Sequence, residues 1–492
     1  MANGETVLNA EARYRLQPGL TLLAGKTGGF LVSVRPLLVV RLNSQALTLL
    51  TGLEGEPTAT EMAQRLPGMS AAEIATFLET LARRRLLSRK PPPAARLPTV
   101  SIIVPAHGRP NATRACIESL LALDYPHERC EIIVVDDASK PPLAPLLADF
   151  PVHLLRQPHN IGQSAVRNLA AEKASGELLA FIDNDCIAAP NWLTALLPYL
   201  DTPALGIVGG RVIAPPPTGR IAAFEAVRSP LDMGPVGGEV GPRESIAYLP
   251  TCNLLVRRDL LLAQGGFNTA MRLGEDVDFL WRSLRSGSRA YYVPEGQIIH
   301  YHRVQLRQLL KRRADYGSSE AELQRRHPEG RRIMRVPLVV TLLLVACAAF
   351  PLSGLVGAPL MGLVVVLLMR ELTEKYQQLR QGGISVPLRW LGGALLREHM
   401  ASLYHLSATI TRYYSLPLLM AVWFWPSLLL PTVILLLIAP LGEYRRRQPG
   451  LAFGFFIGLY WLEMAAYQYG VWRGCFSTRS FWPLLPLLRW DR

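Results

Sequence analysis

The sequence predicts an α/β protein in which a largely parallel sheet, covered by helices on both faces, follows a small N-terminal unit and precedes an apolar helical region. Three observations support this fold class. Short apolar runs alternate with segments of helical period after Thr99. A basic, proline-rich stretch comes just before that alternation. Long uncharged runs are concentrated after Arg335, where they are long enough for membrane helices.

Residues 1–90 predict a small winged-helix-like unit. Phe30 to Leu42 is rich in Val and Leu and is interrupted at Arg35-Pro36, which indicates a β-hairpin. Asn43 is expected to cap a helix that ends at Gly52. Two further helix starts have capping-box spacing, Thr58 with Glu61 and Ser70 with Glu73. A stiff proline-rich linker is expected at residues 91–98.

Residues 99–335 carry the alternating pattern. Segments of helical length lie at 112–123 and 162–175. Short apolar runs with polar ends predict strands at 100–106, 131–137, 152–156 and 178–185. Ligands of open α/β sheets bind beyond the carboxyl ends of the strands, and the acidic residues of this region fall at those ends.

Asp183-Asn184-Asp185 follows the apolar run LLAFI, so two carboxylates stand one residue apart on a turn. Mg²⁺ and Mn²⁺ prefer oxygen ligands and commonly bridge a protein carboxylate to substrate phosphates. The alternative is a solvated turn without a metal. His300 and His302 follow another strand-like run and are candidates of nearly equal rank to complete the metal shell. A structural role is the alternative for both histidines.

Two other polar groups follow predicted strands. Asp136-Asp137 suits a carboxylate that binds the base or ribose of a nucleotide, and the alternative is a capping turn. Arg167, on the helix after Asn160-x-Gly162, suits a phosphate contact, against the alternative of a salt bridge on a helix surface.

A third acidic group is Gly274-Glu275-Asp276-x-Asp278. Asp276 is a candidate general base, since a carboxylate beside a water-poor pocket can take a proton from a reacting hydroxyl. Acidic residues are also favoured in a first helical turn for structural reasons alone. Asn253 of Thr251-Cys252-Asn253, expected at the end of a short strand, is a candidate for orienting a second substrate.

The net charge and the cysteine spacing limit which partners and which cellular compartment are expected. The net charge of +14 includes basic groups at 311–335 and 445–447, beside the apolar runs, which favours an anionic membrane surface over nucleic acid, so no nucleic-acid partner is expected. The six cysteines are scattered without a C-x-x-C pair, so reduced thiols are expected in place of zinc or disulfides. The charged N-terminus has no apolar run typical of a cleavable signal, which predicts a soluble part facing the cytoplasm.

Residues 336–492 predict a membrane-associated helical region at the cytoplasmic membrane. Val336–Met369 is uncharged and suits two short spans that turn near Pro351 or Gly354. Leu416–Leu441 is one span or a bent one, and Leu451–Trp472 is aromatic and suits an interface. If both basic flanks of Leu416–Leu441 are cytoplasmic, that run cannot cross once, so the topology stays open.

Taken in order, VSIIVPAHGR, VVDDAS, HNIGQSAVRN, FIDNDC, TCNLLVRR and GEDVDFLWR resemble the motifs of family 2 inverting glycosyltransferases with the GT-A fold. The resemblance covers about Val100 to Arg303. It implies a UDP-sugar donor, Mn²⁺ or Mg²⁺, and inversion by direct displacement. The implied roles are a uridine contact at Asp136, a phosphate-side contact at Arg167, metal binding at Asp183 or Asp185, and the base at Asp276. Within these motifs, further donor-site candidates are Pro105, Asp137, Gly162 and Asn253, and Glu275 accompanies the base.

Processive synthases of this family carry Gln-x-x-Arg-Trp after the base. Here Arg389-Trp390 has Val386 in the place of the Gln, which argues against synthesis of long polymers.

The N-terminal unit, with LNSQALTLLTGLEGEPTATEMAQRL and SAAEIATFLETLARRRLLS, is similar to PqqD-like peptide-recognition modules. The fusion of such a module to a family 2 transferase and an apolar tail resembles the mycofactocin-system glycosyltransferases. That family implies β-1,4-linked glucose added to a peptide-derived redox cofactor. A transferase for lipid-linked or cell-envelope saccharides is the alternative, and a degenerate peptide-binding scaffold is a more distant one.

Overall fold

A computed structural model describes residues 10–491, except 18, 26–27, 35–36, 67, 85, 95, 302–304 and 382–385. The chain divides into two compact units, which are 1–15 with 54–304, here called unit 1, and 16–53 with 305–492, called unit 2. The elements of the predicted N-terminal unit are therefore shared between the two. The predicted domain boundaries at 90, 98 and 335 stay predictions.

In unit 1, the N-terminal elements are two capped helices and a two-stranded sheet. Helices α2 (Ala59–Arg65) and α3 (Ala71–Arg83) both begin with complete capping boxes, at Thr58 and Ser70, as the spacing predicts. Strand β1 (Arg13–Leu16) pairs with β5 (Leu87–Lys90), and neither strand was predicted. Glu79 of α3 accepts a hydrogen bond from the Tyr14 hydroxyl at 3.4 Å, which ties the helix to β1.

In unit 2, the N-terminal elements are an antiparallel sheet of β2 (Leu20–Gly25), β3 (Gly28–Val34) and β4 (Leu37–Leu42). The predicted hairpin is confirmed in β3 and β4, although Arg35-Pro36 at its turn lies outside the described residues. Helix α1 (Ser44–Thr51) begins at Asn43, whose side chain accepts a hydrogen bond from the Ala46 N–H at 2.7 Å.

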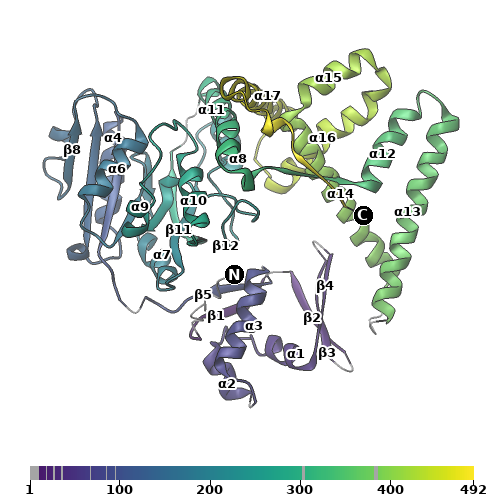
Figure 1. The fold of residues 1–492 in the computed structure, drawn as a ribbon, viewed down its shortest axis with the longest axis horizontal. Coiled ribbons are helices and arrows are strands. Elements are labelled where there is room, and N and C mark those ends of the chain that lie inside the picture. The colour runs from purple at the N-terminus through teal and green to yellow at the C-terminus, as the bar shows by residue number, and fades with distance from the viewer. Residues whose placement is uncertain are drawn as a thin grey trace. The chain divides into compact units, whose positions relative to one another are not determined.

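The centre of unit 1 is a mixed nine-stranded sheet in the order β10-β14-β11-β13-β9-β6-β7-β8, with β12 paired to β14 (Figure 1). The strands are β6 (Val100–Ala106), β7 (Cys130–Asp137), β8 (His153–Gln157), β9 (Leu178–Phe181), β10 (Cys186–Ala188), β11 (Leu205–Ile213), β12 (Gly238–Glu239), β13 (Leu254–Arg257) and β14 (Arg289–His300).

The prediction of a largely parallel sheet is confirmed for only part of this sheet. Strands β9, β6, β7 and β8 are parallel neighbours, and so are β11 and β14. Strands β10, β12 and β13 run antiparallel to theirs, so the sheet is mixed. The parallel half is the half in which long helical crossovers join the strands, and such crossovers are what parallel pairing requires.

Helices cover both faces of the sheet, and alternate residues of each strand feed the two cores. Ile102 belongs to one core, with Ile117 of α4 (Pro110–Leu121) and Trp192 of α7 (Trp192–Leu200). Ile103 belongs to the other, with Val166 of α6 (Gln163–Lys173) and Phe279 of α10 (Glu275–Arg285). The remaining helices of unit 1 are α5 (Ala144–Leu147), α8 (Arg220–Arg228) and α9 (Arg258–Ala263).

Unit 2 is otherwise helical. Its elements are α11 (Leu306–Arg326), β15 (Ile333–Pro337), α12 (Leu338–Ala349), α13 (Gly354–Gln381), α14 (Leu388–Tyr413), α15 (Ser415–Phe424), α16 (Leu429–Arg447), α17 (Phe453–Thr478) and β16 (Leu487–Asp491). The first apolar run turns between α12 and α13, as predicted near Pro351 or Gly354. The second is broken between α15 and α16, in keeping with the bent alternative. Strands β15 and β16 pair in parallel.

Helices α11 and α17 approach so closely that only glycine fits at three positions. A Cβ on Gly470 would lie 1.9 Å from the Ala314 carbonyl oxygen, and one on Gly317 would lie 2.3 Å from the Tyr467 carbonyl oxygen. Gly474 is similarly close to Ser318. The same interface buries an ion pair between Arg313 and Glu463, with Nε and Oε1 2.7 Å apart. Residues 311–326 of the basic stretch predicted as a membrane flank therefore lie on a packed helix.

Candidate active site

The site lies at the carboxyl ends of β6, β7 and β9. These strands are parallel neighbours, so their ends meet at one edge of the sheet. The loop after β6 carries His107, Gly108 and Arg109, and the loop after β9 carries Asp183 and Asp185. The long strand β14 ends there too, because His300 pairs with Cys186 of β10.

The D-x-D turn is fixed at each of its three residues. The middle residue, Asn184, is buried and donates through Nδ2 to the Thr113 hydroxyl at 2.8 Å, which holds the turn against α4. Asp183 Oδ1 accepts a hydrogen bond from Arg167 at 2.8 Å. Asp185 Oδ2 is paired with the Arg109 guanidinium. The turn is therefore an ordered part of the fold, unlike the solvated turn that was its alternative reading.

His300 lies beside Asp185. Its Nε2 is 3.6 Å from Asp185 Oδ1, and the Tyr301 N–H donates to the Asp185 carbonyl oxygen at 3.0 Å. Ligand atoms of Asp185, His300 and Cys186 all lie within 4.8 Å of one another. Burial raises the pKa of the Cys186 thiol well above its ordinary value, so this sulfur stays protonated and is a poor metal ligand. His302 lies outside the described residues.

Asp136 and Asp137, at the end of β7, are both buried and bonded to protein groups. Asp136 accepts from the Ser139 N–H at 2.8 Å and the Leu143 N–H at 3.2 Å, and it pairs with the Arg156 guanidinium. Burial alone would raise the pKa of Asp136, but these bonds lower it below its ordinary value. The carboxylate thus orders the loop after β7, which corresponds to the capping alternative.

Asp137 does the same for the neighbouring loop. It accepts from the Ile161 N–H at 2.7 Å and from the Gly162 N–H at 3.1 Å. Gly162 has φ of +86°, a conformation that favours glycine, and it directly precedes α6. His107 Nδ1 donates to the Asp137 carbonyl oxygen at 2.6 Å. The loops after β6, β7 and β8 are therefore held to one another through Asp137.

Arg167 is buried, contrary to its alternative reading as part of a surface salt bridge. Its Nη2 donates to Asp183 and its Nη1 donates to Glu275 Oε1 at 2.9 Å. The guanidinium also lies 5.9 Å from the centre of the Phe267 ring. Desolvation lowers the pKa of Arg167, but the charges of Asp183 and Glu275 more than reverse this, so it is a permanent cation. This side chain joins the D-x-D turn to the start of α10.

Glu275 and Asp276 open α10 after Gly274, whose φ of +83° is left-handed. Asp276 is partly buried, and its Oδ1 accepts from the Val277 N–H at 2.9 Å. Among the described residues, no side chain donates a hydrogen bond to this carboxylate. Burial and the neighbouring charge of Glu275 raise the pKa of Asp276 to about 7, although Val277 and Arg167 oppose the shift.

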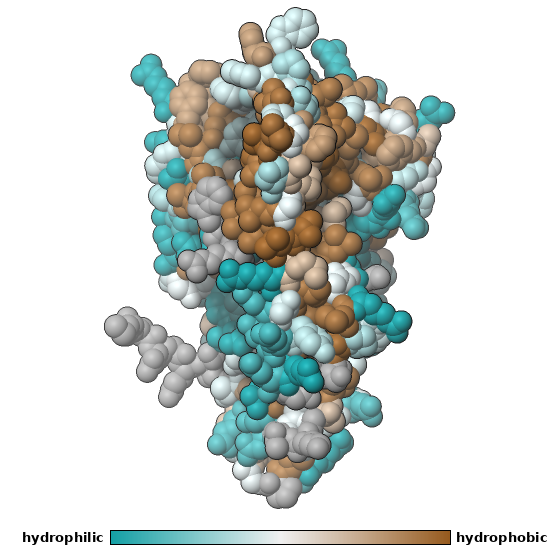
Figure 2. Space-filling view, turned by 90° about the vertical axis from the view of Figure 1, so that its right-hand side faces the viewer, coloured by the Kyte–Doolittle hydropathy of each residue, from teal (hydrophilic) through white to brown (hydrophobic). Residues whose placement is uncertain are grey.

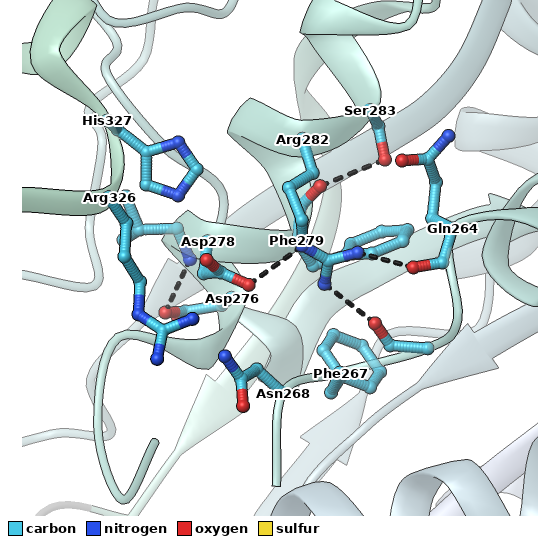
Figure 3. Close-up of polar contacts among 12 residues, drawn as sticks. Gln264, Phe267, Asn268, Asp276, Asp278, Phe279, Arg282, Ser283, Arg326 and His327 are labelled. Carbon is cyan, nitrogen blue, oxygen red and sulfur yellow. Dashed lines mark hydrogen bonds and ion pairs between the residues drawn. The ribbon is translucent and has the colours of Figure 1, made fainter. Parts of the chain in front are cut away.

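Asp278 differs from Asp276 although both lie in the first turn of α10. Asp278 is buried and pairs with Arg282, with Oδ2 and Nε 2.8 Å apart (Figure 3). Arg282 in turn donates to the carbonyl oxygens of Gln264 and Gly266. Asp278 therefore belongs to the packing of α10, whereas no described side chain pairs with Asp276.

Two predicted site residues are embedded in the fold. Asn253 is fully buried, donates to the carbonyl oxygens of Arg211 and Gly296, and accepts from Trp192 Nε1 at 2.7 Å. It precedes strand β13 and does not end one, because Thr251–Asn253 forms a short 3-10 turn. Pro105 is buried within β6, opposite Val135. The geometry of both supports a packing role.

Arg109 is a site residue that the motifs did not single out. Its φ of +52° is unusual for a side chain with a Cβ, and it directly precedes α4. This strained conformation directs the guanidinium to Asp185. The available sequence signal was its position, since Gly108-Arg109 follows the carboxyl end of a buried strand.

Comparisons with known proteins agree with this geometry. Residues 101–262 match the model of glycosyl transferase family 2. The pre-mycofactocin glycosyltransferase of Mycobacterium tuberculosis (strain ATCC 25618 / H37Rv) is 28% identical over 450 residues, covering 85% of this chain and 88% of the relative. Glycosyltransferase AglE of Haloferax volcanii is 29% identical over 39% of this chain and 63% of AglE.

Among solved structures, the mannosyltransferase PcManGT from Pyrobaculum calidifontis, in complex with GDP-Man and Mn²⁺, is 18% identical with a TM-score of 0.38. The match covers 63% of this chain and 89% of the mannosyltransferase. The family match and the mixed sheet with acidic loops at its carboxyl edge describe a GT-A-like domain. Residues 101–262 are therefore a glycosyl transferase family 2 domain, and the chain as a whole is similar to a pre-mycofactocin glycosyltransferase.

Proposed function

We propose that the chain is an inverting, metal-dependent glycosyltransferase that moves glucose from UDP-glucose onto a peptide-derived redox cofactor of the mycofactocin type, building a short β-1,4-glucan. The acceptor is supported by the similarity to the pre-mycofactocin glycosyltransferase, which extends over 85% of the chain. The mechanism is supported above all by the state of Asp276, which has a raised pKa and accepts no hydrogen bond from a described side chain.

Asp276 is the proposed base. A pKa of about 7 lets the carboxylate be ionised near neutral pH and still accept a proton readily. It would take the proton of the acceptor hydroxyl as that oxygen attacks the anomeric carbon. Because the attack comes opposite the departing nucleotide, the configuration inverts. Arg167 binds both Glu275, the residue before Asp276, and Asp183 of the D-x-D turn. This one side chain would therefore position the base relative to the sugar donor.

The donor set fits a hard divalent cation such as Mn²⁺ or Mg²⁺. Asp185 and His300 offer a carboxylate oxygen and an imidazole nitrogen 3.6 Å apart, and Asp183 stands two residues before Asp185. The Arg109 cation already pairs with Asp185, which supports a site that holds positive charge. When bound, the metal would neutralise negative charge on the departing diphosphate. We include Asp183, Asp185 and His300 in this proposed metal site.

The N-terminal elements are proposed to form a PqqD-like module that receives the peptide-derived acceptor. The confirmed hairpin and capped helices are the elements that the similarity to such modules requires. We also propose that the enzyme works at the cytoplasmic membrane with its catalytic domain in the cytoplasm. Two helices, Gly354–Gln381 and Pro426–Arg447, are long and apolar enough to cross a membrane.

A second candidate acceptor is a lipid-linked or cell-envelope saccharide. The exposed apolar side chains of unit 2, which suit contact with lipid, favour this candidate.

Two acceptor pools separate the candidates. Detergent-solubilised protein with Mn²⁺ and a panel of nucleotide-sugars would be given a peptide-derived cofactor precursor or a membrane lipid extract, with products read by mass spectrometry. A hexose increment on the precursor is expected. An increment only in the lipid pool would refute the cofactor assignment and retain the transferase.

The metal site has its own test. His300→Ala and Asp185→Asn should each weaken Mn²⁺ binding by about tenfold to a hundredfold, measured on the purified protein by the electron paramagnetic resonance signal of free Mn²⁺. His153→Ala, an exposed histidine on β8, is the matched control and should bind like the parent. Unchanged binding in both site variants would remove the metal from the proposal.

A further inference from the structure

The apolar part of unit 2 consists of two helical hairpins. Helices α12 and α13 turn back on each other at residues 350–353, and α15 and α16 do so at residues 425–428. The hairpins pack together, since Val340 of α12 shares a core cluster with Leu435 of α16. Both turns lie at the upper end of this unit (Figure 1).

The apolar lengths are short for a bilayer. Helix α12 is about 18 Å long and α15 about 15 Å, at a rise of 1.5 Å per residue. The uncharged parts of the two longer helices, 354–369 and 429–442, measure about 24 Å and about 21 Å. The hydrocarbon core of a membrane is about 30 Å thick. Each hairpin can therefore enter a membrane and return. None of these uncharged segments matches the full thickness, although the whole of α13 and residues 426–447 are long and apolar enough to cross.

The four most exposed large apolar side chains of the described residues, Leu355, Trp423, Leu352 and Phe424, lie at or beside the two turns. We call these, together with Phe350 and Trp425, the tip residues, and their exposed fractions are Phe350 59%, Leu352 76%, Leu355 89%, Trp423 84%, Phe424 68% and Trp425 62%. Figure 2 shows apolar side chains gathered over the upper part of this face, with hydrophilic side chains below them. An exposed apolar surface of this extent is typical of a site that contacts a membrane or a partner.

Basic residues lie at the ends of the two hairpins that are opposite to their turns. Arg335 precedes the first hairpin, and Arg370 ends its apolar part. Arg412 precedes the second hairpin, and Arg445–Arg447 ends it. Because each hairpin returns, the basic residues at its two ends lie on one side, where they can meet anionic headgroups. This arrangement removes the conflict created by basic flanks on both sides of Leu416–Leu441.

Helix α17 is the remaining apolar segment, and its packing keeps it out of a spanning position. Its buried face contacts α11, and Gly470 lies against Ala314. Helix α11 carries many exposed or partly exposed charges, among them Arg307, Lys311 and Arg312. Charges placed at the centre of a bilayer are costly. The α11–α17 pair therefore belongs at or outside the membrane surface.

We propose that the chain is monotopic, with both hairpins inserted into one leaflet, the tip residues in the hydrocarbon, the basic ends at the headgroups, and no segment crossing. The bilayer partner is the cytoplasmic leaflet of a membrane rich in anionic lipid. This inference rests on the membrane association in the proposed function, and it adds the depth and the topology.

Cysteine labelling from the two sides of the membrane tests the inference. Leu352→Cys and Trp423→Cys place thiols at the two tips, where the native side chains are mostly exposed, so folding is preserved. Gln378→Cys, on the polar end of α13, and Glu172→Cys, on the exposed surface of α6, are the controls. Each would be treated with a membrane-impermeant maleimide in inverted vesicles and in spheroplasts. The parent chain gives the background of the six native cysteines.

Both controls should react only in inverted vesicles, and both tip cysteines should react at least about tenfold less in either preparation until detergent is added. Reaction of a tip cysteine in spheroplasts, or of Gln378→Cys on the side opposite to Glu172→Cys, would show a crossing and overturn the inference. Reaction of the tips in inverted vesicles would show that the hairpins are not inserted. Flotation of the parent protein with membranes is scored separately, and its failure would refute membrane association itself.

Discussion

Buried charges serve different purposes in the two units of this protein. In unit 2, Arg313 and Glu463 pair across a helix interface where the nearby glycines leave no room for other groups. In unit 1, Arg167 binds Asp183 and Glu275, but the adjacent Asp276 accepts no hydrogen bond from a described side chain. The buried ion pair of unit 2 stabilises the fold. In contrast, the Asp276 carboxylate, which has no described side-chain partner and a raised pKa, can take up a proton during the reaction.

The comparison predicts that Asp276→Asn damages catalysis and leaves the fold intact. Loss of the base should lower kcat by about a thousandfold, because positioned general bases contribute about 10² to 10⁴. Steady-state transfer assays and thermal unfolding on the same preparations would measure the two effects. Asp259→Asn, an exposed carboxylate in the first turn of α9, is the matched control and should keep full activity. Unchanged turnover in Asp276→Asn would refute the assignment of the base.

The opposite pattern is expected for Arg313→Met. Removal of the cation leaves Glu463 buried without its ion-pair partner, which should lower the free energy of unfolding by about 3 to 5 kcal/mol. Chemical denaturation measures this loss, and kcat per folded molecule should not change. Adding Glu463→Met should recover most of the stability, since an apolar pair can replace a buried ion pair. Arg307→Met, exposed on the same helix, serves as the control.

The smallest expected effect is on the pH profile. Asp276 works as a base only when ionised, so kcat/KM should fall by about tenfold per unit below pH 7 and level off above it. Glu275→Gln removes one charge that raises the pKa of Asp276, so the acidic limb should move to lower pH. Glu172→Gln, an exposed carboxylate on α6, should leave the profile in place. An acidic limb that moves upward in Glu275→Gln would contradict the proposed electrostatics.

The sequence predicted the parallel half of the sheet because strands buried on both faces read as apolar runs separated by helical segments, as in 100–106 and 131–137. The antiparallel half was not predicted because β10 and β12 are too short to show an alternating or apolar pattern. No helical segment beside them indicates a crossover either. Strands β15 and β16 of unit 2 were also not predicted. They pair with each other although all the apolar helices lie between them in the sequence.

The acidic motifs of the site were visible in the sequence, but their partners were not. Asp183 and Asp276 stand where strand and helix ends predict reactive groups. The burial of Arg167 depends on Glu275, more than a hundred residues away, and local spacing carries no such information. The three long-range hydrogen bonds of the Asn253 amide were likewise not visible from local spacing.

The pairing of β15 with β16 also sets an order for biosynthesis. Strand β15 leads directly into α12, but its partner is translated only after every apolar helix of the unit. The hairpins are therefore made before the strand that closes the unit around their base. Until then they would need lipid or a chaperone to shield them, so membrane targeting during translation would protect this protein from aggregation.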